Sequence, residues 1–308
     1  MSATTSPRVA ILTVTTNASR HLPAYLDALC AITYPAWELW LVDNASQDGS
    51  AEIVEDRLPA ARVLRNDRNL GFTGASNRAL HEILACPEAP AYVLFLNDDT
   101  EVTPGFLEPL VARAAGERTL AAPRTYLAGH DGLLDDSVGE FDWWRGTWRE
   151  RTLGRPPGPG DGHARRVGNA NLSCLLVPTS AFAEVGLLDD AFFVYYDDTD
   201  FCRRLGDAGY EIWLEPASVV AHRKGATLGG QLNAFGCYYL ARNRPYLIRK
   251  HEGRARFAAF FAYYLATRIA RSALWLARGR RDLAAATWRG IADFARNRMG
   301  ARHRSPER

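Results

Sequence analysis

Residues 92–99 of the chain read YVLFLNDD, so five apolar residues come directly before an amide and two carboxylates. A short, continuous apolar run with polar neighbours is typical of a strand that is buried on both faces of a parallel sheet. In open sheets of this kind the functional groups lie beyond the carboxyl ends of the strands. The stretch therefore predicts an α/β fold with a chemical site at Asn97, Asp98 and Asp99.

Strand-like and helix-like segments alternate around this run through about the first 125 residues. The hydrophobic pattern predicts strands at 9–15, 38–43 and 62–65, and helices at about 22–31, from residue 50, and at 74–84. Such alternation is typical of strands joined by right-handed helical crossovers. We therefore expect a mostly parallel central sheet.

The second half of the chain is less regular. Residues 124–167 include a Pro/Gly-rich stretch at 154–162, which predicts irregular structure. The elements expected after it are strands at 171–177 and 211–214 and helices from residue 179, over 199–208 and from 234 onward. We predict an α/β domain over 1–233 and a helical, Arg-rich region over 234–308.

The composition fits a globular protein whose charge is unevenly distributed. With 308 residues, 47% of them hydrophobic, the chain is long enough for a sizeable core and too apolar for a disordered protein. The net charge is only +2, but residues 1–241 hold 20 basic and 31 acidic side chains, whereas 242–308 hold 17 and 4. An acidic body with a basic tail predicts two environments, or a partner that binds the tail alone.

The basic tail also carries many apolar residues. Arg268, Arg271 and Arg278 are spaced for one face of a helix, and aromatic and aliphatic residues run through 257–276. A basic, aromatic, amphipathic helix suits the headgroup layer of an anionic membrane, so one prediction is peripheral membrane contact through 254–308. The other is a helical hairpin that packs on the body with its Arg side in solvent. Nucleic-acid binding is disfavoured because the acidic body repels a polyanion.

Cysteines and apolar runs predict the compartment. The five cysteines are scattered and form no C-x-x-C motif, as is typical of free thiols in a reducing environment. The chain has no uncharged apolar run of 18 residues, so we expect no spanning helix. The run at 9–14 lacks the features of a secretory signal. The expected location is the cytoplasm, at the inner face of the cell membrane.

Carboxylates follow two of the predicted strands. Asp43 and Asn44 come after an apolar run, where a carboxylate can accept hydrogen bonds from a ribose or a base edge. A plain turn is the alternative. Asp98 and Asp99 repel each other unless a cation screens them, and Mg²⁺ or Mn²⁺ takes one or two carboxylates together with diphosphate oxygens. The sequence thus predicts a metal–diphosphate site after residue 96.

A third acidic cluster, Asp197, Asp198 and Asp200, follows the aromatic run at 192–196. One aspartate would suffice to cap the next helix. A carboxylate beside another carboxylate and an aromatic wall tends to have a raised pKa, which suits a general base. His222 follows an apolar run and is interpreted either as a structural histidine or as a further metal ligand.

Motifs of several other enzyme classes are absent from the sequence. There is no G-x-G-x-x-G after the first predicted strand, no G-x-x-x-x-G-K-[ST] and no G-x-S-x-G. Dinucleotide-binding, P-loop and α/β-hydrolase interpretations therefore lose their main support.

The chain resembles glycosyltransferase family 2 over about residues 8–250. The matching segments are 9–17, 42–50, 69–72, 96–100, 185–190 and 196–200. The stretch 238–250, with Arg242-Asn243-Arg244, is similar to the rhamnosyltransferase-like branch. The resemblance implies a GT-A type nucleotide-binding sandwich with a donor half at about 8–123, an acceptor half at about 124–233 and a helical C-terminal extension.

The resemblance also implies roles for individual residues. A nucleoside-diphosphate sugar would be bound by Thr15, Asn17, Asp43, Asn44, Asn69, Gly71, Asn77, Asn97 and Asp98. Asp99 and His222 would ligate Mg²⁺ or Mn²⁺, and Asp198 would be the catalytic base. Asp197, which stands where the family has Glu, would contact a glycan or lipid-linked acceptor.

Trp143 and Trp144 are also expected at the acceptor because aromatic faces stack on sugar rings; the alternative is a surface insertion whose tryptophans fill the core. The implied reaction is metal-dependent transfer of a sugar, with rhamnose favoured, that inverts the anomeric centre. Two alternatives stay open. One is a non-catalytic, membrane-peripheral subunit of polysaccharide assembly, and the other is a sugar nucleotidyltransferase.

Overall fold

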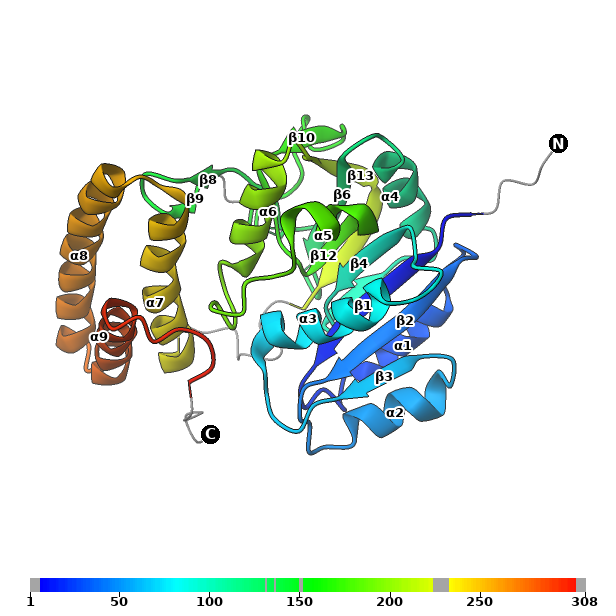
Figure 1. The fold of residues 1–308 in the computed structure, drawn as a ribbon, viewed down its shortest axis with the longest axis horizontal. Coiled ribbons are helices and arrows are strands. Elements are labelled where there is room, and N and C mark those ends of the chain that lie inside the picture. The colour runs from blue at the N-terminus through cyan, green and yellow to red at the C-terminus, as the bar shows by residue number, and fades with distance from the viewer. Residues whose placement is uncertain (1–5, 131, 136, 150–151, 224–232, 303–308) are drawn as a thin grey trace.

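The structure is a computed structural model (Figure 1) that describes residues 6–130, 132–135, 137–149, 152–223 and 233–302. Parts of the predictions for the α/β domain, for the Pro/Gly-rich loop region and for the tail fall on residues 1–5, 131, 136, 150–151, 224–232 and 303–308, and these lie outside the described residues.

The strands are β1 (Val9–Thr15), β2 (Trp37–Asp43), β3 (Arg62–Arg65), β4 (Tyr92–Leu96), β5 (Thr100–Val102), β6 (Thr119–Leu127), β7 (Val138–Gly139), β8 (Phe141–Asp142), β9 (Thr147–Trp148), β10 (Arg165–Val167), β11 (Asn169–Ala170), β12 (Cys174–Pro178) and β13 (Glu211–His222). The helices are α1 (Leu22–Cys30), α2 (Ser50–Arg57), α3 (Gly71–Leu84), α4 (Leu107–Ala114), α5 (Thr179–Val185), α6 (Asp197–Asp207), α7 (Ala234–His251), α8 (Arg254–Ala277) and α9 (Arg281–Ala295).

One mixed sheet forms the centre of the molecule. Its order over the described residues is β10-β13-β6-β12-β4-β1-β2-β3, and β5 pairs with β13. The strands β3, β2, β1 and β4 run parallel to one another, as do β6 and β13. Strand β12 is antiparallel to both of its neighbours, β4 and β6. The predicted α/β fold is thus confirmed.

Helices cover both faces of the sheet because its inner strands are apolar on both sides. Along β1, Val9 and Ile11 pack with α1, α2 and α4, whereas Ala10 and Leu12 pack with α3, α5 and α6. Phe95 of β4 likewise lies against Phe182 of α5, at 6.3 Å between ring centroids. Because both faces of these strands are buried, a shift in strand register would be costly. The register therefore determines which residues lie at the strand ends.

The carboxyl ends of the parallel strands meet at one edge of the sheet. Thr15 pairs with Asp43 in the register of β1 and β2, and Leu12 pairs with Phe95 in that of β1 and β4. Continuing the second register by three residues brings Thr15 level with Asp98. Topology therefore places the residues predicted after β1, β2 and β4 side by side.

Among the longer strands of the sheet, β6 was not predicted and β13 was predicted only in part, and the short strands β5 and β7 to β11 were not predicted either. Strand β6 includes Pro123 and runs on to Leu127, into the region from residue 124 that was expected to break the regular alternation. Strand β12 pairs with β6 at Leu176 and Ala121. Pro123 lies two residues past this pair, so the N–H that proline lacks is not needed for the contact with β12. Strand β13 continues past the predicted end to His222, with an irregular register between Glu215 and Val219.

The region after residue 233 is helical, as expected, and it forms a bundle of α7, α8 and α9 beside α6 (Figure 1). Helices α7 and α9 pack closely because Gly290 has no Cβ; a Cβ there would overlap the carbonyl of Tyr238. Among the helices that the structure describes, none is long and apolar enough to cross a membrane.

Candidate functional site

The end of β4 carries two buried aspartates with different partners. The hydroxyl of Thr15 donates a hydrogen bond to Oδ2 of Asp98 at 2.6 Å. On the other oxygen of Asp98, Oδ1, the Nε2 atom of His21 lies 3.6 Å away, and this closeness raises the pKa of His21 above its ordinary value. Asp98 is therefore held by β1 and by the start of α1.

Asp99 lies against His222 of β13. Its Oδ1 atom is 3.2 Å from Nε2 of His222, while Nδ1 of the same ring is 2.8 Å from Oδ2 of Asp135. Burial disfavours the charged imidazole, but the two carboxylates outweigh that effect and raise the pKa of His222 to about 9. A histidine that holds a buried carboxylate on its second nitrogen is the arrangement commonly found around metal-ligating histidines.

Asp99 and His222 fit a metal ion that shares its other ligands with a substrate. Oδ1 of Asp99 is buried and lies 3.2 Å from Nε2 of His222, so a metal ion that bound both atoms would replace the proton between them. No group of three or more His, Cys, Asp or Glu side chains among the described residues is placed to hold a metal by itself. Two protein ligands suit Mg²⁺ or Mn²⁺ because these ions commonly take diphosphate oxygens and water as well.

Several of the predicted donor residues form a hydrogen-bond network after β2. The side chain of Asn44 donates to Oδ1 of Asn69 at 3.0 Å and accepts from the backbone N–H of Leu70 at 2.9 Å. Asn69 in turn accepts from the N–H of Gly71 at 2.8 Å. The network therefore fixes the shape of the loop that precedes α3.

Asp43 and Asn17 lie at the neighbouring turns. Oδ1 of Asp43 accepts from the N–H of Ser46 at 3.3 Å. Asn17 has a left-handed backbone with φ 51°, donates its N–H to the hydroxyl of Ser46 at 2.9 Å and accepts from Gln47. The loops after β1 and β2 are thus joined to each other beside the strand ends.

Asn77 lies six residues after Gly71 on α3, nearly two helix turns further on, and it contacts a different segment. Its side-chain amide donates to the carbonyl of Leu188 at 2.8 Å and to Oδ1 of Asp190 at 2.7 Å. Its oxygen accepts from the N–H of Leu188 at 3.0 Å. The structure therefore groups Asn77 with the segment after α5, whereas Thr15, Asp98, Asp99 and His222 form a separate group.

The other acidic pair, Asp197 and Asp198, begins α6. Asp197 is buried, and desolvation together with the charge of Asp198 raises its pKa well above the ordinary value. Desolvation raises the pKa of Asp198 to about 6, although its Oδ1 accepts hydrogen bonds from the N–H of Thr199 at 2.6 Å and from the Thr199 hydroxyl. These bonds favour ionisation of Asp198 over Asp197, and partial solvent access leaves Asp198 open to a substrate.

A short segment ties the two acidic pairs together. The N–H of Asn97 donates to the carbonyl of Ser173 at 2.9 Å, and Asn169 lies 3.4 Å from the hydroxyl of Thr199. Residues 169–173 can span at most about 15 Å even when fully extended. The ends of β4 and of the segment before α6 therefore belong to one region of the molecule.

The third aspartate of this cluster, Asp200, has cationic partners that the other two lack among the described residues. Asp200 is fully buried and lies 2.9 Å from Arg204, 2.7 Å from Lys250 and 2.7 Å from His251. Burial alone would raise its pKa, but these partners lower it. Asp200 joins α6 to the end of α7, which is a structural role.

The two tryptophans expected at the acceptor differ in their contacts. Trp143 packs edge to face on Phe141 at 4.9 Å and on His251 at 5.5 Å, with the guanidinium of Arg203 at 4.7 Å. Trp144 is 48% exposed. The structure thus makes Trp143 part of the contact with α6 and α7, and leaves Trp144 open to solvent.

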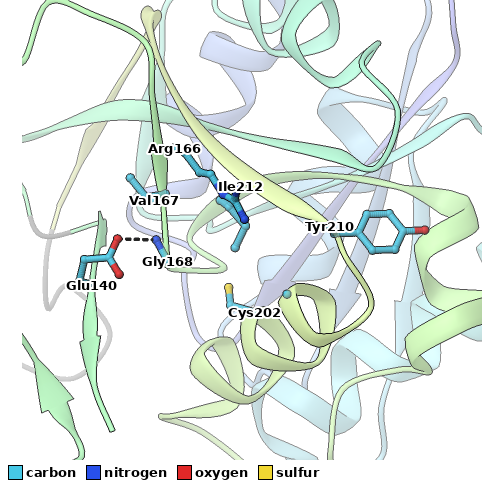
Figure 2. Close-up of a pocket in the computed structure, with 8 residues that line it drawn as sticks. Glu140, Arg166, Val167, Gly168, Cys202, Tyr210 and Ile212 are labelled. Atoms are coloured by element: carbon cyan, nitrogen blue, oxygen red, sulfur yellow. Dashed lines mark hydrogen bonds between the residues drawn. The ribbon is translucent and has the colours of Figure 1, made fainter.

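A pocket of about 380 Å³ lies elsewhere, between β10, β13 and α6 (Figure 2). Cys202 and Ile212 line it, and at one side Glu140 accepts a hydrogen bond from the N–H of Gly168 at 2.9 Å. None of the site residues predicted from the sequence lines this pocket. It is therefore distinct from the group at the strand ends.

Two residues of the site escaped the sequence analysis. His21 precedes the first helix, where the sequence offers no motif that links it to Asp98 more than 70 residues away. Asp135 lies within the segment expected to be irregular, and its contact with His222 depends on the pairing of β6 with β13, which brings Leu127 opposite His222. A sequence analysis that predicted the parallel pairing of β6 with β13 could have placed Asp135 near His222.

Comparison with known proteins agrees with this architecture. The model of the family described as "Glycosyl transferase family 2" matches residues 10–166. The chain is 29% identical over 240 residues to the N-acetylglucosaminyl-diphospho-decaprenol L-rhamnosyltransferase of Mycobacterium tuberculosis, covering 71% of this chain and 77% of that protein. It is also 29% identical over 139 residues to the low-salt glycan biosynthesis hexosyltransferase Agl10 of Haloferax volcanii, covering 44% and 43% of the two chains.

Solved structures show the same fold at low identity. The mannosyltransferase PcManGT from Pyrobaculum calidifontis, in complex with GDP-Man and Mn²⁺, superposes with a TM-score of 0.58 at 15% identity, over 96% of this chain and 88% of that one. GalNAc-T7 with UDP, GalNAc and Mn²⁺ gives 0.57 at 17% identity, over 70% of this chain and 43% of that one. The architecture is therefore shared with GT-A glycosyltransferases.

Proposed function

Because this chain belongs to glycosyl transferase family 2 and is a glycosyltransferase, we propose that it transfers a sugar from a nucleoside diphosphate to a lipid-linked acceptor, with inversion of the anomeric centre. Rhamnose is the favoured donor sugar. The rhamnose and the lipid-linked acceptor come from the name of the mycobacterial relative, which covers 71% of this chain.

The observation that carries the proposed mechanism is the difference between the two acidic pairs. Asp98 and Asp99 lie beside His21 and His222, at 3.6 and 3.2 Å. Asp197 and Asp198 have raised pKa values through burial. One pair is suited to a cation and a diphosphate, the other to holding and releasing a proton.

Asp198 acts as the base in this proposal. It accepts the proton of the acceptor hydroxyl while that oxygen attacks the anomeric carbon from the face opposite the diphosphate. Because Thr199 stabilises the charge on Asp198, Asp197 keeps its own proton and can donate a hydrogen bond to the acceptor. The pair thus orients the nucleophile and takes its proton.

Asp99 and His222 would hold Mg²⁺ or Mn²⁺, and Asp135 would fix the ring of His222. When bound, the ion supplies positive charge that offsets the charge of the departing diphosphate. Asp43, Asn17 and the loop fixed by Asn44 and Asn69 would surround the nucleoside; Thr15, Gly71, Asn97 and Asp98 complete the proposed donor site. Asn77 would act on the donor site indirectly, through its hydrogen bonds with Leu188 and Asp190.

Donor binding and transfer test the proposed function together. Thermal unfolding would be measured with dTDP-rhamnose, UDP-sugars and GDP-mannose, each with and without Mn²⁺. A true donor should raise the unfolding temperature only when Mn²⁺ is present, since a ligand that binds the folded state stabilises it. Transfer to a polyprenyl-diphosphate-linked N-acetylglucosamine should follow. Release of pyrophosphate from a sugar phosphate and a nucleoside triphosphate would instead identify a nucleotidyltransferase.

We also propose that α8 contacts an anionic membrane. Four of its large apolar side chains are exposed by 40–59%: Tyr263, Ile269, Leu274 and Leu276. At 100° per residue they lie on one side of the helix, with alanines between them, and buried Phe260, Tyr264 and Trp275 lie on the opposite side. Residues 254–281 include seven arginines and no acidic residue. An exposed apolar stripe with basic flanks suits an anionic lipid surface.

Vesicle co-sedimentation tests this contact. Vesicles that contain phosphatidylglycerol should bind the protein, and pure phosphatidylcholine vesicles should bind it more weakly. The double variant Ile269→Glu/Leu274→Glu should lose most of that binding, while Leu240→Glu, a 37% exposed leucine on α7, serves as the control. Equal binding by both variants would contradict the proposal, and self-association through the same face would point to a second copy of the chain.

A further inference from the structure

The segment that leads into Asp197 and Asp198 has an unusual backbone. Phe193, Tyr195 and Tyr196 have φ angles of 68°, 65° and 67°. None of them is a glycine, and a bulky residue in the left-handed region costs about 1–3 kcal/mol. Such a conformation persists only where surrounding contacts hold it.

One side of this segment, residues 191–196, is held by Asn243 of α7. Its side-chain amide lies 2.9 Å from the carbonyl oxygen of Phe192, 2.7 Å from that of Val194 and 3.1 Å from that of Tyr195. Asn243 is completely buried. A single amide group therefore draws three carbonyls of the segment toward one point.

Arg242 extends this contact. Its Nη2 atom donates to the carbonyls of Ala191 at 3.1 Å and Phe192 at 2.9 Å, and its Nε donates to Oδ1 of Asn243 at 2.9 Å. The side chain is 1% exposed, and no carboxylate of the described residues lies within ion-pair distance. A guanidinium buried without a counter-ion is costly unless its N–H groups are hydrogen-bonded, and here backbone carbonyls and the Asn243 side chain accept from it.

The opposite side of the segment is held by the start of α3. The N–H of Phe72 donates to the carbonyl of Phe193 at 2.8 Å. Gly71, with φ 74°, has no room for a side chain, because a Cβ would overlap both the ring and the carbonyl of Phe193. The start of α3 and the side chains of α7 therefore contact the segment 191–196 on two sides.

We infer that Arg242 and Asn243 are positioning residues for the transfer reaction. They hold the segment 191–196, with its left-handed Phe193, Tyr195 and Tyr196, and thereby fix the direction in which Asp197 and Asp198 face the donor. The inference rests on the proposed role of Asp198 as the base. Helix α7 then acts on the reaction without touching the substrate, through the backbone that precedes the base.

Arg242→Lys tests the inference, with Arg244→Lys as the matched control. The lysine keeps the charge but cannot donate to Ala191, Phe192 and Asn243 together. Arg244 is similarly buried on the same helix, yet it donates to the carbonyl of Arg145 and lies over the ring of Tyr264. Asn243→Ala is the second variant, because it removes the contacts with the three carbonyls.

We expect kcat to fall at least tenfold in Arg242→Lys and Asn243→Ala, because a shift of about 1 Å at a catalytic group can cost 10²-fold. Binding of the nucleoside diphosphate with Mn²⁺ should change less than twofold. Amide hydrogen exchange should rise at 192–198 but not at 92–96. Arg244→Lys should keep kcat within threefold of the wild type.

The outcomes separate the inference from the proposed function. A wild-type protein that binds donor but transfers nothing would refute the proposed function. Faster amide hydrogen exchange at 192–198 in Arg242→Lys would still support the claim that α7 holds the backbone of this segment. Unchanged exchange in both variants would overturn the inference. So would faster exchange with an unchanged kcat, and so would equal losses of kcat in Arg242→Lys and Arg244→Lys.

Discussion

Two of the adjacent aspartate pairs in this protein, Asp98-Asp99 and Asp197-Asp198, have opposite surroundings. Asp98 and Asp99 follow a buried strand and face Thr15, His21 and His222. Asp197 and Asp198 begin α6; Asp198 accepts hydrogen bonds from Thr199, and within the described part of the chain neither aspartate forms an ion pair with a cationic side chain. The neighbouring groups thus decide whether a carboxylate pair is suited to bind a cation or to hold and release a proton. A carboxylate beside an imidazole suits a site for a metal that carries a diphosphate, and a desolvated carboxylate suits a base.

The largest expected effect comes from removing the base of the second pair, Asp197 and Asp198. Asp198→Asn keeps the size of the side chain and an oxygen for the N–H of Thr199, but it cannot accept a proton. Positioned base catalysis contributes about 10²–10⁴-fold, so kcat should fall by that factor. Steady-state transfer assays would measure it. Turnover within threefold of the wild type would remove Asp198 from the mechanism.

Changing the first pair should affect binding before turnover. Asp99→Asn removes a charged ligand, and we expect the affinity for Mn²⁺ in the presence of nucleoside diphosphate to fall about 10²-fold. Asp135→Asn leaves both ligands in place but loosens the ring of His222, and outer partners of this kind contribute about 10–100-fold. Isothermal titration with Mn²⁺ would measure both. An Asp135→Asn effect larger than that of Asp99→Asn would reverse the assignment.

The pH dependence of kcat/KM sharpens the comparison. Because burial raises the pKa of Asp198 to about 6, the base is protonated and inactive below that pH. We expect kcat/KM to rise about tenfold per pH unit up to pH 6 and to level off above it. Thr199→Val removes the hydroxyl that favours the ionised form, so it should move this limb to higher pH. A profile that is flat between pH 5 and pH 7 would contradict the role of burial.

Stability should show the smallest effect. A carboxyl whose pKa is raised on folding stabilises the folded state while it is protonated, and this contribution is lost as the pH rises from about 4 to about 6. Asp198→Asn carries no such loss and should be more stable than the wild type at pH 7.5, by about 1 kcal/mol. Thermal unfolding at pH 7.5 and pH 4.5 would measure the difference, which should shrink at the lower pH. A destabilised variant at pH 7.5 would show that the charge is better solvated than the burial implies.

Much of the fold could be predicted from the sequence because apolar runs and turn residues are local signals. Strands β1, β3 and β4 have the predicted bounds, and helices α3 and α6 begin within three residues of the prediction. Strand β6 was missed because Pro123 and the irregular region after it hide a strand whose partners lie far away in sequence. Pairing over such distances leaves no local pattern.

The site was predictable to the extent that its residues follow strands. Asp99 and His222 do, and the structure places them 3.2 Å apart. His21 and Asp135 lie in connecting segments, where only the tertiary fold reveals their contacts. Arginine composition was a similarly incomplete guide to the tail. Arg242 of α7 is buried against backbone carbonyls, whereas Arg271 of α8 is exposed beside Trp275.

The different roles of the two aspartate pairs are tested most directly by one titration experiment on a variant of each pair. Nucleoside diphosphate would be titrated by calorimetry into Asp99→Asn and Asp198→Asn, each with and without Mn²⁺. The account predicts that Asp99→Asn loses the increase in affinity that Mn²⁺ gives the wild type. Asp198→Asn should retain that increase in full while failing to turn over. An Mn²⁺-dependent increase that survives in Asp99→Asn and disappears in Asp198→Asn would contradict the account.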